Sequence, residues 1–101
     1  MPGPVELGEF IDDIDAALSI YYPGGMGVQV VTDIMYGKVN PSGHLTCTWP
    51  VRYEDAPAFL CYPDGYHCNY GEGIFVGYRG YQKRKLAPMF PFGWGLSYTT
   101  Y

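Results

Sequence analysis

Carboxylate side chains are the residues of this sequence that could do acid–base chemistry. Glu72 is the candidate for a general acid, because the loop Tyr70-Gly71-Glu72-Gly73 has glycines on both sides that would let a carboxyl group approach a substrate. We favour a structural interpretation, in which Glu72 pairs with Arg79 or accepts a hydrogen bond from a backbone amide. No catalytic residue is therefore assigned. Of the carboxylates outside the first predicted helix, Glu72 is kept as the one weak candidate; the others are Asp33, Glu54, Asp55 and Asp64.

Sulfur and imidazole side chains are too sparse for a predicted metal site. His44 and Cys47 have a plausible ligand spacing, but the paired C-x2-C repeats of a structural zinc site are absent. Three cysteines do not suit a disulfide scaffold, which leaves open whether Cys61 and Cys68 pair across an Asp64-Gly65 turn. We expect no metal and no cofactor.

Aromatic side chains recur near the C-terminal end, at Phe90, Phe92, Trp94 and Tyr98. Such a row can stack on a sugar ring, and it can equally be hydrophobic core. The core interpretation is favoured, so no binding residue is assigned, and Phe92 and Trp94 are kept as candidates for substrate binding.

Composition limits what these residues can belong to. At 101 residues the chain has room for one small domain or for a piece of a larger one, and 48% hydrophobic residues are too many for a disordered polymer. A formal charge of −4 argues against a nucleic-acid groove. No apolar run approaches the roughly 20 residues of a membrane helix, and no signal-peptide pattern is present. The run Lys83-Arg84-Lys85 is interpreted as a solvated turn.

Helix and strand patterns alternate in the first half of the chain. Apolar spacing predicts a helix from Phe10 to Tyr21, with Asp12, Asp13 and Asp15 on its surface. A second helix is predicted over Gly27 to Gly37, since Gly37 is a typical stop, although Val28 to Ile34 also alternates as a strand would. After a turn, Leu45 to Trp49 alternates and predicts a strand. Helix followed by strand indicates the α/β class.

The second half is predicted to hold loops and strands. Tyr53 to Asp64 is expected to be an extended loop, and Gly73 to Tyr81 alternates as a strand would. Met89 to Gly95 is an aromatic loop, and Leu96 to Tyr101 begins another strand pattern at which the sequence stops. Together with Met1-Pro2-Gly3-Pro4 at the start, this suggests a segment taken from a longer chain.

Several motifs resemble the end of the second domain of glycoside hydrolase family 3. They are Pro23-Gly24-Gly25, Asp33 to Gly37, Asn40-Pro41-Ser42-Gly43 through Leu45 to Pro50, Glu72 to Tyr81, and Phe90 to Tyr101. The family's versions are P-G-Q-E-G-G, A-D-V-L-F-G-D-x-N-P-S-G-x-L-P-x-T-x-P, E-G-I-F-V-G-Y-R and F-P-F-G-x-G-L-S-Y-T. Thr46 and Cys47 depart from the pattern, as does Gly25-Met26-Gly27.

The resemblance implies a fold and a division of the chain. The fold is a fragment of the family's α/β sandwich domain, with two helices and several short strands. Residues 1–63 would be the end of that domain, and residues 64–101 would lead toward a fibronectin type III-like domain.

The resemblance also implies a function. The family's enzymes are β-glucosidases and β-xylosidases that retain anomeric configuration, using an Asp on a barrel domain and a Glu of the sandwich domain. Both residues precede this segment in the family, so no catalytic residue carries over and the isolated chain is expected to be inactive. Its partners would be a β-linked oligosaccharide or glycoside and the missing barrel domain, in a secreted, periplasmic or cytoplasmic parent. The alternative is an independent non-catalytic module that binds carbohydrate or forms homo-oligomers through strand edges and a tyrosine-rich surface.

Overall fold

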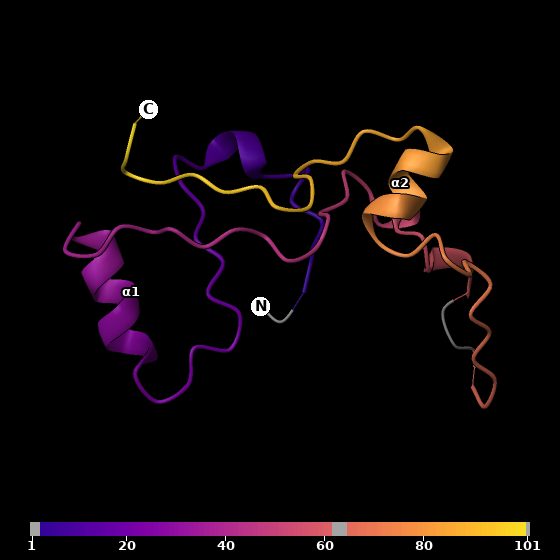
Figure 1. Cartoon of the computed structure of the whole chain (residues 1–101), viewed down its shortest axis with the longest axis horizontal. Coiled ribbons are helices and arrows are strands. Elements are labelled where there is room, and N and C mark those ends of the chain that lie inside the picture. Colours follow the sequence, from indigo (N-terminus) through magenta and orange to yellow (C-terminus); the bar gives the residue numbers. More distant parts are fainter. Residues whose placement is uncertain (1–2, 62–64, 101) are drawn as a thin grey trace.

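The computed structural model describes residues 3–61 and 65–100. The body measures 46 × 32 × 26 Å, with helices α1 (Gly27–Met35) and α2 (Tyr78–Arg84) at opposite ends of its long axis (Figure 1). Three short 3-10 helices complete the set: η1 (Ile11–Asp13), η2 (Tyr53–Asp55) and η3 (Phe59–Cys61). The Cα radius of gyration is 16.1 Å, above the ~13 Å typical of a compact 100-residue domain. The chain is therefore extended for its length.

Helix α1 confirms the helix predicted over Gly27 to Gly37. Its C-terminus is a Schellman motif, in which the N–H of Gly37 donates to Ile34 O (3.0 Å) and the N–H of Lys38 donates to Asp33 O (2.8 Å). Gly37 has φ +74°, the left-handed conformation that glycine adopts without a Cβ penalty. A local signal in the sequence therefore ends this helix where the prediction placed the stop.

The helix predicted from Phe10 to Tyr21 is wrong. Only η1 forms there, and Tyr21 itself has φ +48°. The apolar side chains of the predicted face, among them Phe10, Ile14 and Leu18, are exposed. Because most helical stability in proteins comes from packing an apolar face, a segment without a packing surface lacks the main force that would keep it helical. Asp12, Asp13 and Asp15 are exposed, as expected of surface residues.

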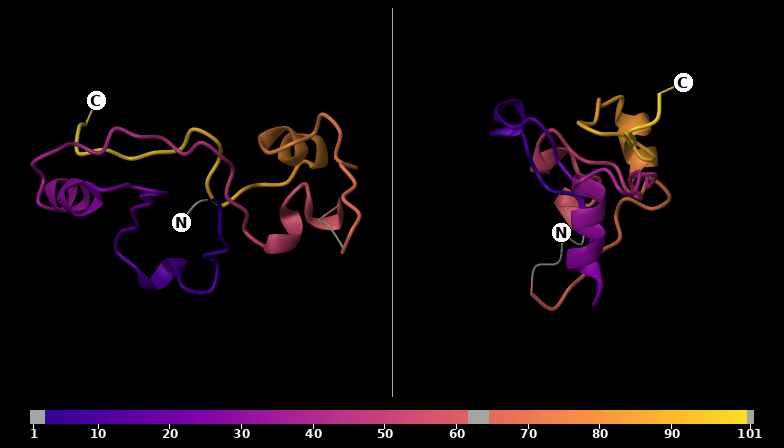
Figure 2. Two further views of the ribbon diagram at one scale, coloured as in Figure 1. Left: turned by 90° about the horizontal axis from the view of Figure 1, so that it is seen from below. Right: turned by 90° about the vertical axis from the view of Figure 1, so that its left-hand side faces the viewer.

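Two backbone segments run antiparallel between the helices, residues 45–49 and 89–94 (Figures 1 and 2). The N–H of Trp49 donates to Phe90 O (2.8 Å), and the N–H of Met89 donates to Trp49 O (2.9 Å). Farther along, the N–H of Leu45 donates to Trp94 O (2.7 Å), and Leu45 O accepts from the N–H of Gly93 (2.9 Å). The segments are thus pinned at both ends and unpaired between them.

The pairing is a single isolated bridge, Trp49–Phe90, so the predicted strand from Leu45 to Trp49 is wrong as a regular strand. Pro91 follows Phe90 and has no N–H to continue the ladder. No strand forms over Leu96 to Thr100 either, and Tyr101 and the predicted turn residue Asp64 lie outside the described residues.

The strand predicted over Gly73 to Tyr81 is also wrong, because α2 begins at Tyr78. Gly77 has φ +57° and ψ −132°, which breaks the extended chain and starts the helix. The basic run is exposed, as predicted, but only Lys85 lies in a turn: Lys83 and Arg84 form the last helical turn, where positive charge is favoured by the helix dipole. Lys85 follows in the left-handed conformation, at φ +55°.

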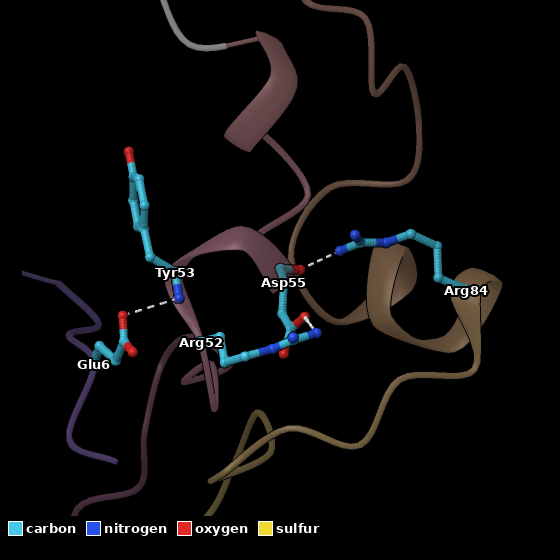
Figure 3. A network of polar contacts seen from close by, with 5 residues as sticks. All are labelled: Glu6, Arg52, Tyr53, Asp55 and Arg84. Atoms are coloured by element: carbon cyan, nitrogen blue, oxygen red, sulfur yellow. Dashed lines mark hydrogen bonds and ion pairs between the residues drawn. The ribbon is translucent and has the colours of Figure 1, made fainter. Parts of the chain in front are cut away.

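A polar network ties three parts of the chain together beside α2 (Figure 3). Asp55 is buried, and its carboxylate pairs with the Arg52 guanidinium at 3.1 Å. Arg84 of α2 donates to the backbone carbonyl of Asp55, and the N–H of Tyr53 donates to Glu6 Oε2 at 3.1 Å. The N-terminal segment, η2 and α2 are therefore held by one connected set of polar contacts.

Tyr81 is one of three buried hydrophobic side chains of the described residues, with Leu7 and Trp49. Burial raises the pKa of its phenol, the negative charge of Asp55 raises it further, and the Arg84 guanidinium opposes both. Folding therefore favours the neutral form of the Tyr81 phenol.

We predict that Gly80→Ala destabilises the protein. A Cβ at this position would lie 2.5 Å from Pro57 Cγ and 2.6 Å from Phe75 O. A helix-interior Gly→Ala change normally stabilises by about 1 kcal/mol, but here we expect the free energy of unfolding in urea to fall by about 1–3 kcal/mol from overpacking. Gly43→Ala is the control, since nothing lies within 4 Å of its Cβ position. A Gly80→Ala protein more resistant to urea than the wild type would contradict the prediction.

We also predict a loss of stability at alkaline pH that depends on Tyr81. The pKa of Tyr81 is raised in the folded state, so its contribution is complete below the unfolded pKa of about 10 and is lost as the pH rises toward the folded value. Melting temperatures between about pH 8 and about pH 11 should fall less steeply in Tyr81→Phe than in the wild type. Tyr66→Phe, at a fully exposed position, should follow the wild-type curve. Identical slopes for Tyr81→Phe and the wild type would refute the assignment.

Candidate functional site

Glu72 lies in the turn before α2, half-buried, and makes neither of the contacts expected of it. Its Oε2 atom is buried and has no hydrogen-bond partner among the described residues. Arg79 instead donates weakly to Ile74 O (3.4 Å) and lies 5.8 Å from the Tyr78 ring centroid. Within residues 3–61 and 65–100, the one ion pair is Arg52–Asp55. The predicted Glu72–Arg79 pair is therefore wrong.

The other candidate carboxylates do not gather around Glu72. Asp33 accepts a hydrogen bond from Gln29 on α1 (2.8 Å), and Asp55 belongs to the polar network at η2. Glu54 is exposed, and Asp64 lies outside the described residues. In the part of the chain that the structure describes, no three His, Cys, Asp or Glu side chains are grouped so that they could ligate a metal ion.

The cysteines and histidines are separate as well. Cys47, Cys61 and Cys68 are free thiols, so the pairing of Cys61 with Cys68 that the sequence left open is not made. The Sγ of Cys61 packs where a Cβ on Gly71 would lie, at 2.7 Å. His44 Nδ1 is 2.9 Å from Gly93 O, a contact that helps to hold the aromatic loop.

No described helix is long and apolar enough to cross a membrane.

The aromatic side chains divide between core and surface. Trp49 is 4% exposed and meets Phe90 edge-on, with ring centroids 6.4 Å apart. Phe92 and Trp94, the two candidates for substrate binding, are 55% and 43% exposed. The core interpretation therefore fails for these two rings, which are accessible to a ligand.

Phe92 borders a pocket on one side of α2. The pocket has a volume of about 260 Å³, and Tyr78, Tyr81, Gln82 and Lys85 also line it. The rings of Phe92 and Tyr78 pack against each other, with centroids 5.3 Å apart and planes at 33°. Trp94 does not line this pocket. Of the two aromatic candidates, the structure therefore joins only Phe92 to a cavity.

The α2 residues of this pocket were missed because residues 73–81 were interpreted as a strand. One signal could have found them. Gly77 is followed by a run that holds Gln82, Lys83 and Arg84, which all have good helix propensity. On a helix, Tyr78, Tyr81, Gln82 and Lys85 fall three or four residues apart and share one face.

Known proteins resemble this chain over almost its whole length. The family model described as "Glycosyl hydrolase family 3 C-terminal domain" matches residues 1–98. A probable beta-glucosidase I of Emericella nidulans is 47% identical over 87 residues, which are 85% of this chain and 10% of that protein. A beta-glucosidase of Kluyveromyces marxianus is 41% identical over 99 residues, which are 97% of this chain and 12% of that protein. The chain thus spans about a tenth of the length of these curated relatives.

Solved structures agree in fold. The crystal structure of the Kluyveromyces marxianus beta-glucosidase in complex with glucose superimposes with a TM-score of 0.88 at 43% identity, covering 96% of this chain and 12% of that one. Beta-glucosidase 3B of Thermotoga neapolitana, also in complex with glucose, gives a TM-score of 0.88 at 37% identity, covering 96% of this chain and 14% of that one. The family match covers nearly every residue and the fold agrees with it, so the chain belongs to the C-terminal domain family of glycosyl hydrolase family 3.

Proposed function

We propose that this chain is part of a retaining β-glycosidase of the β-glucosidase type, in which it shapes and supports the enzyme without carrying its catalytic pair. The observation that carries the proposal is the identity of 40–47% with proteins named as β-glucosidases, over 85–97% of the chain. Glucose complexes of two proteins of similar fold support a β-linked glucoside as the substrate class.

The carboxylates of the chain support a non-catalytic role for it within the enzyme. Retaining hydrolysis needs two carboxyl groups about 5–5.5 Å apart on either side of the scissile bond. Asp55 is buried in an ion pair, and Asp33 is held by Gln29 on α1. Glu72 has one carboxylate oxygen that is buried without a partner among the described residues. We therefore place both catalytic carboxylates outside this chain.

The exposed apolar surface supports a structural role within a larger polypeptide. Of the described residues, 24 large hydrophobic side chains are exposed, and only Leu7, Trp49 and Tyr81 are buried as core. Large exposed apolar patches mark surfaces that contact another part of a protein, a membrane or a ligand, or that aggregate. In this proposal residues 1–63 complete the α/β sandwich domain, residues 64–101 lead toward a fibronectin type III-like domain, and the barrel domain covers part of the apolar surface.

In the complete enzyme, Glu72→Gln should change kcat by less than about tenfold, because loss of a general acid costs about 10²–10⁴-fold. The measurement is steady-state hydrolysis of an aryl β-glucoside. Glu54→Gln, which changes an exposed carboxylate, is the matched control. A loss of several orders of magnitude for Glu72→Gln alone, restored by azide with an activated substrate, would identify Glu72 as the acid and overturn this part of the proposal.

The isolated 101-residue chain should hydrolyse no aryl β-glucoside and should self-associate. The expected contributors include Val28 and Met35 of α1, which are 83% and 72% exposed. In sedimentation velocity, changing both residues to Lys should shift the chain toward monomer. Gln29→Lys is the control, because it adds a charge to α1 without removing an apolar side chain. A wild-type chain that is monomeric at high micromolar concentration would contradict the association, and turnover abolished by one carboxylate substitution would contradict the absence of hydrolysis.

A further inference from the structure

The charges of this chain are divided between its two ends. Residues 1–37 hold six carboxylates and no lysine, arginine or histidine, whereas residues 73–101 hold four basic residues and no carboxylate. The whole chain has a formal charge of −4, so its C-terminal part is positive within an acidic protein. A charge asymmetry of this kind points to interaction surfaces.

The acidic segment comprises residues 9–15 and includes η1. Its four carboxylates are exposed, and none forms an ion pair among the described residues; they are Glu9, Asp12, Asp13 and Asp15. In the sequence, Phe10 and Ile14 lie between these carboxylates, and they are 47% and 39% exposed. The segment therefore presents apolar surface together with negative charges that repel one another.

The basic face of α2 is formed by Arg79, Lys83 and Lys85. All three side chains are exposed, and within the described part of the chain none pairs with a carboxylate. Arg79 and Lys83 are four residues apart on the helix, a spacing at which like charges are neighbours and destabilise it. Arg79 lies 5.8 Å from the Tyr78 ring centroid, and Lys83 Nζ lies 5.2 Å from that of Phe75. The basic face therefore combines positive charge with aromatic surface.

The two surfaces lie on different parts of the molecule. The ribbon of η1, in indigo, and that of α2, in orange, are apart in every view (Figures 1 and 2). The ion pair Arg52–Asp55 is the only one within residues 3–61 and 65–100, so no ion pair joins the surfaces there. Within one copy, neither surface neutralises the other.

We propose that the acidic segment of one copy binds the basic face of α2 on a second copy. The carboxylates meet the cationic side chains, and Phe10 and Ile14 pack against the rings of Phe75 and Tyr78. Because the two surfaces differ, the contact is heterologous and leaves every pair with one unused surface of each kind, so association continues head to tail. Exposed charges contribute little each and are screened by salt, so the contact is weak and depends on ionic strength. The proposal involves no catalytic group and goes beyond the proposed function.

Carbodiimide cross-linking tests the contact directly, because the reagent forms an amide between a carboxylate and a lysine amine that touch. An equal mixture of unlabelled and 15N-labelled 101-residue chains is cross-linked and analysed by peptide mass spectrometry. We expect cross-links from Asp12, Asp13 or Asp15 to Lys83 or Lys85 that join one labelled and one unlabelled peptide. Their yield should fall at least about fivefold between about 20 mM and about 500 mM NaCl, because salt screens exposed charges.

Lys38 is the matched control for the cross-linking experiment. It is exposed, and it lies outside the basic face. Cross-links from the acidic segment to Lys38 should be rare at both salt concentrations. Association through the apolar residues of α1 does not depend on screening, so the fall in yield with salt separates the two kinds of contact.

Two neutralised variants test the head-to-tail geometry by sedimentation velocity at low salt. One carries Asp12→Asn, Asp13→Asn and Asp15→Asn, and the other carries Arg79→Gln and Lys83→Gln. Each variant alone should lose the salt-dependent association of the wild type. An equimolar mixture should recover it, limited to pairs, because each variant keeps the surface that its partner lacks.

Neither loss would follow from misfolding or from net charge. All five substituted residues are exposed, so both variants should unfold at the wild-type urea concentration. The three Asp→Asn changes bring the net charge closer to zero, which by itself favours association. A chain with Lys38→Gln and Glu54→Gln is the control, since both residues are exposed and lie outside the two surfaces.

Four results would overturn the proposal. Cross-links confined to peptides of one isotope would place the contact within a single copy, and cross-links spread equally to Lys38 would make it non-specific. Association that salt leaves unchanged would show that charge does not drive it. The fourth result is association of either neutralised variant alone as strong as that of the wild type. None of these results bears on whether the complete protein hydrolyses a β-glucoside.

Discussion

Backbone pairing between residues 45–49 and 89–94 is the interaction on which the arrangement of this chain depends. It joins residues that are forty or more positions apart in sequence, and the two helices lie beyond its opposite ends (Figure 1). The Trp49–Phe90 bridge and the edge-on contact of the two rings fix one end of the pairing. The backbone hydrogen bonds of Leu45 with Gly93 and Trp94 fix the other end. Because Pro91 interrupts the ladder, the pairing leaves an aromatic loop instead of a continuous strand.

The same pairing brings together two of the three segments that line the pocket. Thr48 and Phe92 come from the paired segments, and Tyr78, Gln82 and Lys85 come from α2. Helix α2 is held against the middle of the chain by the bond from Arg84 to Asp55 O and by the close contact of Gly80 with Pro57. The pocket is lined by residues along the whole of this short helix, whereas the contacts that hold the helix in place are made by Arg84 and Gly80, which do not line the cavity.

Little apolar surface is buried within the described part of the chain, which bears on how the protein achieves stability. Hydrophobic burial is the dominant favourable term in folding, and only Leu7, Trp49 and Tyr81 are buried as apolar core. Side-chain bonds that reach across the sequence, such as Tyr98 O–H to Ile34 O (2.7 Å), hold segments in place but add only about 0.5–1.5 kcal/mol each. The proposed larger polypeptide would supply the missing burial, which is consistent with a chain that spans about a tenth of its relatives' length.

The sequence by itself determined the family, helix α1 and the site of its end, because each depends on local residues in order. Gly37 ends α1 through a Schellman motif that six consecutive residues, 33–38, complete, and the motifs between Pro23 and Tyr101 identified the family without any three-dimensional information. Tertiary structure decided the rest. Apolar spacing from Phe10 to Leu18 produced no long helix because no surface lies against it, and alternation from Ile74 to Tyr78 produced no strand because no neighbouring strand pairs with it. The position of α2 decides that Phe92 lines a cavity and that Trp94 lies outside it. That position is set by contacts between residues far apart in sequence.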